Sequence, residues 1–420
     1  MNTFPASRLH ELGVELFVAC GAPDEEAETV AAHLVEASLM GIDSHGVVRY
    51  IWYVKQCLEG GIRPGAPVEV VRDNGQLALV DCGMNFGQVG ARRMVEWVRD
   101  RALEGGIAFA VSRHCHHVGR LGAYPQALAE AGLFGFAVAN SQRHGHFVVP
   151  WGGREGRLAT NPLAWSAPTL TRDRPILLDM STSMTPEGKV RTALHAGQTL
   201  PAGRVLDADG HPTTDPAAFY GDDDGPPAGA ILPFGGDLGY RGFGLGLLVE
   251  ILGASIAGVE LGDGHDIPYI NGFSLLAINP ATITGEANRF SALTEELKLI
   301  QPRVKLLRSA SSLAMQMEGA GILVFTRSGN LAGKLSSLRP NRVPIHVFTD
   351  TPRLHRKLQM RWGLDPFLMD FSEDPEITVM QAIERLKEAG RVSPGDCLVA
   401  VTNALALDKM VESIQLREVE

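Results

Sequence analysis

The chain lacks the sequence signals of several protein classes. Its five cysteines are widely spaced and include no CxxC pair, so reduced thiols are expected rather than a disulfide framework. Lysine and arginine are scattered and the formal net charge is −10, which argues against a nucleic-acid partner. No run reaches roughly 18 uninterrupted apolar residues, and Glu11 and Glu15 interrupt the first twenty, so we expect neither a membrane span nor a signal peptide. These absences favour a cytoplasmic protein. The cysteines are Cys20, Cys57, Cys82, Cys115 and Cys397.

Composition and patterning predict a globular α/β protein. The 420 residues are 45% hydrophobic and 20% charged, which is enough for two or three domains with their own cores. A helix is predicted over Pro23–Met40, because acids fill its first turn, apolar positions recur at helical spacing and Gly41 follows. Between about residues 76 and 170, strand-like runs alternate with helical stretches, which indicates an α/β layer. The expected strands are Leu77–Val80, Ile107–Val111 and Phe134–Ala139, and the expected helices are Gly90–Leu103 and Gly122–Glu130.

The composition changes twice further along the chain. Proline, glycine and aspartate accumulate over Pro201–Pro233, where we expect a loop. After about Gln301, helices and strands alternate regularly up to Cys397–Thr402, which predicts a compact parallel sheet covered by helices. The chain is therefore divided into residues 1–300 and residues 301–420. No internal repeat relates the two parts.

The segment Asp43-Ser44-His45-Gly46-Val47-Val48-Arg49 follows the predicted helix directly. Histidine has the unperturbed pKa nearest neutrality, so His45 can take and return a proton. Arginine holds a carboxylate through two parallel hydrogen bonds, so Arg49 is a candidate substrate clamp. The competing interpretation is a surface histidine and arginine in a loop between helices.

A second histidine cluster, Arg113 to Arg120, follows the predicted strand Ile107–Val111. The end of a strand in an α/β protein is a common place for working side chains, and His117 is our second candidate there. A zinc site is the alternative, but neighbouring residues of an extended segment point in opposite directions and the sequence has no HExxH helix. We therefore expect no metal site. Its possible ligands are His114, Cys115, His116, His144 and His146.

Three further segments carry hydroxyl groups or glycines. The Asn-Pro pair at Asn161 comes first, and the strand before Asp179 then ends in the turn Met180–Ser183, which offers hydroxyl and backbone donors to a ribose or a phosphate. Glycines at 242, 244 and 246 open an apolar helix predicted over Leu245–Ile256, but they lack the G-x-G-x-x-G spacing. A Rossmann domain is therefore not predicted. Each segment alone is more typical of a turn or of tight packing.

Taken in order, eight pieces resemble the malate/L-lactate dehydrogenase type 2 family over roughly residues 5–295. They are DSHGVVRY, HVGRLGAY, ATNPLAW, LLDMSTS, EGKV, LPAGRVLDADGHPTTDP, LPFGG and GYRGFGLGLLVEILG. The resemblance implies a nicotinamide-dependent oxidoreductase with a non-Rossmann fold, usually a dimer. It further implies a helical part at about residues 1–75 plus 240–300, and a cofactor-binding part at about residues 76–239.

The resemblance also implies roles for individual residues. The catalytic residues would be His45, Arg49, His117 and Asp179, with Asp179 orienting a histidine or a cofactor hydroxyl. NAD or NADP would contact Thr160, Asn161, Asp179, Met180, Ser181, Thr182, Ser183, Tyr240, Arg241 and Gly242. The chain departs from the family at Cys115, Ala159 and Arg241, where serine, glycine and lysine are usual, and it lacks the family's C-terminal Pro-Gly-Glu loop.

Residues 301–420 resemble instead the C-terminal domain of pyruvate kinase, which is regulatory in that family. The shared pieces include VFTRSGNLA, RP, PI and RWGL. A phosphorylated effector would contact Thr326, Arg327, Ser328, Gly329 and Asn330, where a strand ends in hydroxyls, a basic side chain and amides at a helix N-terminus. Leu331 replaces a usual hydroxyl, and Asn403–Asp408 replaces the usual glycine-rich loop. A scaffold or oligomerisation role is therefore favoured over effector binding.

The sequence thus predicts hydride transfer between NAD(P) and C2 of a small 2-hydroxy or 2-oxo acid, or a related imine. His45 would be the base, His117 would orient or polarise the oxygen, and Arg49 would hold the carboxylate. A homodimer or higher homo-oligomer is expected. The alternative is a regulatory protein that has lost its cofactor loop and binds a nucleotide or a sugar phosphate.

Overall fold

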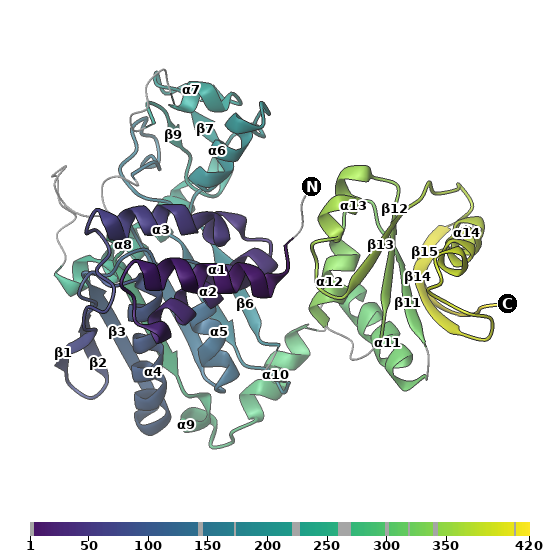
Figure 1. Cartoon of the computed structure of the whole chain (residues 1–420), viewed down its shortest axis with the longest axis horizontal. Coiled ribbons are helices and arrows are strands. Elements are labelled where there is room, and N and C mark those ends of the chain that lie inside the picture. Colours follow the sequence, from purple (N-terminus) through teal and green to yellow (C-terminus); the bar gives the residue numbers. More distant parts are fainter. Residues whose placement is uncertain are drawn as a thin grey trace. The chain divides into compact units, whose positions relative to one another are not determined.

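The computed structural model describes residues 4–141, 146–171, 174–220, 227–258, 270–298, 302–317, 320–338, 343–406 and 409–420. The chain divides into two compact units, one ending at Thr294 and one beginning at Glu295 (Figure 1). Each unit is built on its own sheet, with helices packed against it.

A seven-stranded sheet forms the centre of the first unit, in the order β1-β2-β3-β10-β4-β5-β6. β2 and β3 are parallel, and β10 runs antiparallel between β3 and β4. The assignment of 240–300 to a helical part is wrong in this respect, because β10 lies inside the sheet, with Phe273, Leu275 and Ala277 fully buried. The strands are β1 (Glu69–Asp73), β2 (Leu77–Asp81), β3 (Ile107–Arg113), β4 (Phe134–Ala139), β5 (Leu163–Ala167), β6 (Ile176–Met180) and β10 (Phe273–Ile278).

Helices cover both faces of this sheet. α4 and α5 pack on the face that carries Ala137, whereas α8 packs on the face that carries the next residue, Val138. Since successive side chains of a strand point to opposite faces, these helices form separate layers. The described helices of this unit are α1 (Ala6–Ala19), α2 (Asp24–Leu39), α3 (Tyr50–Leu58), α4 (Gly87–Gly105), α5 (Ala123–Glu130), α6 (Glu187–His195), α7 (Pro216–Tyr220), α8 (Tyr240–Gly253) and α9 (Pro280–Thr284). The boundary between the units falls within α10 (Arg289–Lys298).

The segment 201–233, predicted as a loop, contains a small sheet. Its strands are β7 (Val205–Leu206), β8 (Pro212–Thr213) and β9 (Ala230–Ile231), in the order β8-β7-β9. The loop prediction was wrong because strands of two residues are too short to show an alternation of apolar and polar residues in the sequence. They still enclose a local core, since Val205, Phe219 and Ile231 are fully buried together.

α8 is unusually apolar. By length and composition alone, Tyr240–Ala257 could cross a membrane, and a third of it is buried inside the unit. The same segment carries Glu250, which is buried and accepts hydrogen bonds from Asn140 and Asn161. α8 itself packs on β3, β4 and β10. This is the packing of a helix that belongs to a folded core.

The second unit has a five-stranded sheet in the order β13-β12-β11-β14-β15. Its inner pairs are parallel as predicted, but β15 is antiparallel to β14 and was missed. No glycine or proline marks the turn after β14, so the sequence shows no break there. The elements are α11 (Pro302–Gln316), β11 (Gly321–Phe325), α12 (Asn330–Leu338), β12 (Ile345–Thr349), α13 (Pro352–Leu358), β13 (Leu364–Leu368), α14 (Pro375–Glu388), β14 (Cys397–Ala406) and β15 (Lys409–Glu418).

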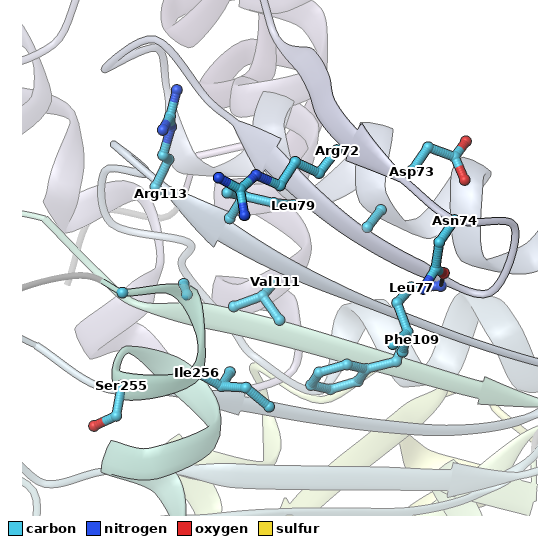
Figure 2. A pocket seen from close by; sticks show the side chains of 13 residues that line it. Arg72, Asp73, Asn74, Leu77, Leu79, Phe109, Val111, Arg113, Ser255 and Ile256 are labelled. Carbon is cyan, nitrogen blue, oxygen red and sulfur yellow. Dashed lines mark hydrogen bonds between the residues drawn. The ribbon is translucent and has the colours of Figure 1, made fainter.

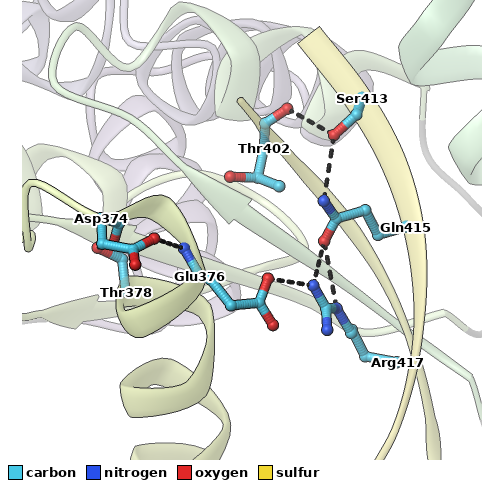
Figure 3. Close-up of polar contacts among 7 residues, drawn as sticks. All are labelled: Asp374, Glu376, Thr378, Thr402, Ser413, Gln415 and Arg417. Carbon is cyan, nitrogen blue, oxygen red and sulfur yellow. Dashed lines mark hydrogen bonds and ion pairs between the residues drawn. The ribbon is translucent and has the colours of Figure 1, made fainter. Parts of the chain in front are cut away.

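Polar contacts hold β15 against α14. The Arg417 guanidinium donates to Glu376 Oε2 at 2.5 Å and to Gln415 Oε1 at 2.6 Å (Figure 3). Glu376 stands in the first turn of α14, which Asp374 caps by accepting the Glu376 N–H at 2.8 Å. The edge strand is thereby tied to a helix N-terminus as well as to its neighbouring strand.

We predict that Gly87→Ala destabilises the first unit by about 2–3 kcal/mol. A Cβ on Gly87 would lie 2.2 Å from His116 O and 2.4 Å from His117 O, which are backbone atoms that cannot swing aside. Gly105→Ala in the same helix is the control, because its Cβ would meet nothing closer than 3.5 Å. Urea unfolding measures both variants; equal midpoints for the two would show that α4 is not held this close to the histidine segment.

Candidate active site

His45 lies in a tight connection between α2 and α3. Two single 3₁₀ turns, Asp43–His45 and Val47–Arg49, flank Gly46. Ser38 Oγ accepts the Val47 N–H at 3.0 Å, and a Cβ on Gly46 would lie only 2.1 Å from that oxygen. Glycine is therefore required for this loop to fold back onto α2. The turn presents His45 and Arg49 from one short stretch of chain.

The structure brings the two predicted histidines together. The rings of His45 and His117 stack with centroids 5.3 Å apart and planes at 28°. Burial, followed by the nearby Arg49 charge, lowers the pKa of His45 to about 4. Burial also holds the pKa of His117 well below its ordinary value, with further lowering from His45 and Arg49. Both imidazoles are therefore neutral at neutral pH and can exchange protons with a ligand.

Tyr53, on α3, hydrogen-bonds to His117. Its hydroxyl oxygen lies 2.7 Å from His117 Nδ1 and accepts a hydrogen bond from Gln88 Nε2 at 2.6 Å. Because the hydroxyl oxygen accepts from Gln88, the hydroxyl can direct its own hydrogen to Nδ1. In that arrangement His117 carries its proton on Nε2, where it can donate to a ligand; when the hydroxyl donates to His117 O at 3.3 Å instead, Nδ1 carries the proton.

Arg49 is anchored but uncompensated. Its Nε donates to Ser44 O at 2.7 Å, and its guanidinium lies 5.3 Å from the centre of the Trp52 ring. Among the described residues no carboxylate forms an ion pair with it. The guanidinium edge not used by Ser44 is therefore left for an anionic ligand beside the two histidines.

Asp179 forms no hydrogen bond or ion pair with an imidazole of the described residues. Its Oδ2 accepts the Gly122 N–H at 2.7 Å, at the start of α5, and a Cβ on Gly122 would lie 2.9 Å from the same oxygen. Burial raises the pKa of Asp179, partly offset by this N–H and by the charge of Arg120. Arg120 is itself buried and pairs with Glu36 at 3.1 Å. Asp179 therefore positions the chain that follows His117.

The predicted hydroxyl-rich turn is a compact hydrogen-bonded unit. Thr160 O accepts from Ser181 Oγ at 2.8 Å and from the Thr182 N–H at 3.1 Å, and Asn161 O accepts from Thr182 Oγ1 at 2.9 Å. Asn161 has a φ of 40°, unusual for a residue with a side chain. Ser181 Oγ and Ser183 Oγ are 2.5 Å apart. Thr160, Asn161 and the turn after Met180 thus form one surface.

Tyr240 and Arg241 are exposed at the start of α8. Arg241 Nε donates to Tyr240 OH at 3.2 Å, and within the described part of the chain neither side chain hydrogen-bonds to or stacks on His45 or His117. Gly242 is buried, and a Cβ there would lie 2.2 Å from Phe234 O. The structure therefore keeps this predicted cofactor contact apart from the paired histidines.

Two possible zinc ligands of the histidine cluster, His114 and His116, contact different neighbours. His114 Nδ1 lies 3.0 Å from Asp81 Oδ1, whereas the His116 ring packs 5.3 Å from Trp52. Cys115 is buried in the sheet core, and His144 lies outside the described residues. A different group with metal-ligand spacing, Asp207, Asp209 and His211, is largely exposed.

A cavity of about 720 Å³ lies elsewhere on the first unit (Figure 2). Leu79, Phe109 and Val111 form its floor on the sheet face, and Arg72 and Arg113 line its rim. None of its lining residues belongs to the histidine site. The histidine site is therefore defined by converging side chains rather than by this cavity.

In the second unit, the predicted phosphate turn is partly engaged by the protein. Arg327 Nε donates to Asp350 Oδ2 at 2.6 Å, and the same guanidinium lies 5.4 Å from the Phe371 ring centre. Thr326 Oγ1 accepts the Gly329 N–H at 2.8 Å. Part of the donor set of this turn is therefore already used. The residues predicted there, Thr326, Arg327, Ser328, Gly329 and Asn330, connect β11 to α12.

Sequence reasoning missed three residues that support the site. Tyr53 and Gln88 act on His117, and Glu250 holds Asn140 and Asn161. Tyr53 stands four residues after Arg49, one helical turn along α3, and this spacing could have indicated it. A glutamate in the middle of an otherwise apolar helix was the corresponding signal for Glu250.

Comparison with known proteins gives two family matches. The malate/L-lactate dehydrogenase model matches residues 4–304, and the pyruvate kinase alpha/beta domain model matches residues 305–406. A malate dehydrogenase of Pyrococcus horikoshii is 36% identical over 258 residues, which are 60% of this chain and 69% of that protein. A Delta(1)-pyrroline-2-carboxylate/Delta(1)-piperideine-2-carboxylate reductase of Pseudomonas putida is 34% identical over 301 residues, 70% of this chain and 84% of that protein.

A solved dehydrogenase from Sinorhizobium meliloti has a TM-score of 0.64 and 32% identity, and the match covers 72% of this chain and 86% of that one. The predicted resemblance and the predicted fold class are confirmed. The chain belongs to the malate/L-lactate dehydrogenase family, and a pyruvate kinase-type α/β domain follows the dehydrogenase part in the sequence.

Proposed function

We propose that the protein transfers hydride reversibly between a nicotinamide cofactor, NAD or NADP, and C2 of a small 2-hydroxy or 2-oxo acid, or of a related cyclic imine. The observation that carries this proposal is an arginine that forms no ion pair with a carboxylate of the described residues and that stands beside two neutral histidines. A guanidinium and two imidazoles are what a substrate with a carboxylate next to a hydroxyl or carbonyl group requires.

Arg49, His117 and His45 have different roles in the proposed reaction. Arg49 holds the substrate carboxylate and so fixes the distance of C2 from the histidines. His117 donates Nε2–H to the substrate oxygen, since Tyr53 occupies its Nδ1. We assign the hydrogen of neutral His45 to Nδ1, which donates to Ser44 Oγ across 2.8 Å, so its Nε2 can accept the hydroxyl proton during oxidation and return it during reduction. No free alkoxide then has to form in the buried site.

The chain also fits a nicotinamide cofactor. When bound, the cofactor supplies or accepts the hydride. Asn161 Oδ1 and Gln88 Oε1 are buried acceptors without a partner among the described residues, which suits a ligand that brings N–H donors such as a carboxamide. We assign the cofactor surface to Thr160, Asn161 and the turn from Asp179 to Ser183. Tyr240, Arg241 and Gly242 would contact a more distant part of the same cofactor.

A homo-oligomer is part of the proposal. The outer side of α8 exposes Leu247, Leu248 and Ile251 at helical spacing, with exposed fractions of 41%, 40% and 54%. An apolar stripe of this kind on an otherwise packed helix is typical of a protein interface. We propose that a second copy of the chain covers it.

For residues 305–406 we propose a structural or oligomerisation role. Arg327 already has its counter-charge in Asp350, so a phosphate would have to compete with an ion pair for the main cation of that turn. This favours the enzyme over a purely regulatory protein that senses a sugar phosphate. All five cysteines are free, which supports our proposal of a reducing, cytoplasmic location.

We predict that His45→Gln and His117→Gln each lower kcat by about 10²- to 10⁴-fold, because general acid–base catalysis contributes that much. The measurement is NADH and NADPH oxidation with pyruvate, oxaloacetate and cyclic imino acids as substrates. His195→Gln, at the exposed end of α6, is the control and should retain wild-type turnover. Wild-type turnover in both site variants would remove the acid–base assignment.

Arg49→Gln is expected to raise the KM for the oxo acid by about 10²-fold, the equivalent of a charge-assisted hydrogen-bond pair worth up to about 3 kcal/mol. The KM for NADH should stay within about twofold, since Arg49 is assigned to the substrate only. Arg63→Gln, at an exposed position, is the matched control. An equal rise in both KM values would place Arg49 in the cofactor site instead.

In the oxidation direction, activity should be lost only at an unusually low pH. His45 must be neutral to act as the base, and its pKa is lowered to about 4, so protonation removes activity only as the pH falls through that range. We therefore expect kcat/KM for the hydroxy acid to keep its neutral-pH value down to about pH 5. Initial rates after brief exposure to each pH test this; a half-point near 6.5 would mean a solvated base.

A further inference from the structure

A buried carboxylate on α8 joins the two halves of the proposed site. Glu250 has only 6% of its surface exposed, although it lies in an apolar helix. Its Oε2 accepts from Asn140 Nδ2 at 2.6 Å and its Oε1 accepts from Asn161 Nδ2 at 2.7 Å. No lysine, arginine or histidine of the described chain pairs with it. A buried charge without a counter-ion is costly, so its retention calls for a specific reason.

One end of this contact leads to His117. Asn140 directly follows β4, and its backbone oxygen accepts from Asn271 Nδ2 at 2.7 Å. Asn271 Oδ1 in turn accepts the N–H of Val118, the residue after His117, at 3.2 Å. Asn140 cannot turn its amide over, because its Oδ1 already accepts the Gly272 N–H at 2.8 Å. The chain beside His117 is thus tied to Glu250 through two asparagines.

The other end leads to the hydroxyl-rich turn. Asn161 gives its second amide hydrogen to Gly246 O at 3.0 Å, so both hydrogens of Nδ2 are used on α8. Its backbone oxygen accepts from Thr182 Oγ1 at 2.9 Å. The positive φ of Asn161 is held by these contacts, and with it the strand end that faces Thr182.

We propose that Glu250 is a positioning residue: its carboxylate holds the His117 segment and the Thr160–Ser183 surface in register. This rests on the proposed function, because that reaction requires substrate and nicotinamide to meet between the two segments. Both oxygens must be acceptors, since the two partners present only N–H groups to them. A glutamine at position 250 could satisfy one asparagine but would direct an N–H₂ group at the other.

The test moves the negative charge from residue 250 to residue 140. In Glu250→Gln, the bond to Asn140 is lost, and in Asn140→Asp two carboxylates face each other across the 2.6 Å contact. In the double variant, the introduced glutamine donates to the introduced aspartate and accepts from Asn161, and the aspartate still accepts the Gly272 N–H. Every hydrogen bond of the network is then restored with the charge on the other partner. Glu286→Gln, at an exposed position, is the matched control.

Two readouts are needed. NADH affinity, from nicotinamide fluorescence, and kcat should each fall by between about 10-fold and 100-fold in both single variants, and return to within about threefold of wild type in the double variant. Hydrogen–deuterium exchange of the Val118 and Thr182 amides should speed up in the single variants and slow again in the double. A residue that only stabilises the fold would lower the melting temperature without changing the kinetics of the folded protein.

The outcomes separate this inference from the proposed function. Wild-type affinity, turnover and exchange in folded Glu250→Gln would overturn it, as would failure of the double variant to recover. If Glu250→Gln does not fold, the double variant alone decides in the same way. If the wild-type chain neither binds NADH nor turns over any acid, the proposed function fails, and the exchange data still show whether Glu250 couples the two segments.

Discussion

The site depends on keeping two imidazoles out of water next to a guanidinium that has no counter-charge. Burial and the Arg49 charge act in the same direction, so His45 and His117 remain neutral where an exposed histidine would be partly protonated. A guanidinium beside neutral imidazoles attracts a carboxylate, and the neutral imidazoles can still accept a proton. The contacts around them serve this arrangement: Ser44 holds Arg49, Tyr53 hydrogen-bonds to His117, and Gly46 and Gly87 permit the close backbone approach.

The sheet explains how distant parts of the sequence reach this place. β10 enters between β3 and β4, so Asn271, just before it, meets both the loop after β3 and the end of β4. α8 then crosses the opposite face and brings Glu250 under the same strand ends. Residues separated by more than a hundred positions thereby share one hydrogen-bond network, and the elements that carry it are held by the main core.

Much of the fold could be predicted because its signals are local. The helix expected over Pro23–Met40 spans Asp24–Leu39, and the strand expected over Phe134–Ala139 has those bounds, since caps and apolar runs determine them. The position of β10, the two-residue strands near Val205 and the antiparallel β15 could not be predicted, because strand order and short pairing depend on distant partners. The same distinction holds in the site. His45, Arg49 and His117 stand in recognisable motifs, whereas the spacing of Tyr53 and the apolar surroundings of Glu250 are weaker signals, and Gln88 is known only from its contact with Tyr53.

The exchanged C-terminal part raises the question of what replaces the family's Pro-Gly-Glu cofactor loop. The groups proposed to handle protons and to bind the substrate carboxylate all come from residues 45–117, and the positioning residue on α8 is Glu250, so these groups precede the exchanged part. Loss of a C-terminal loop would therefore weaken cofactor affinity and leave the protonation chemistry intact. The exposed apolar side of α8 offers a compensation, since a second copy covering Leu247 and Ile251 would order the helix that holds Glu250. Assembly and cofactor binding would then be coupled through one helix.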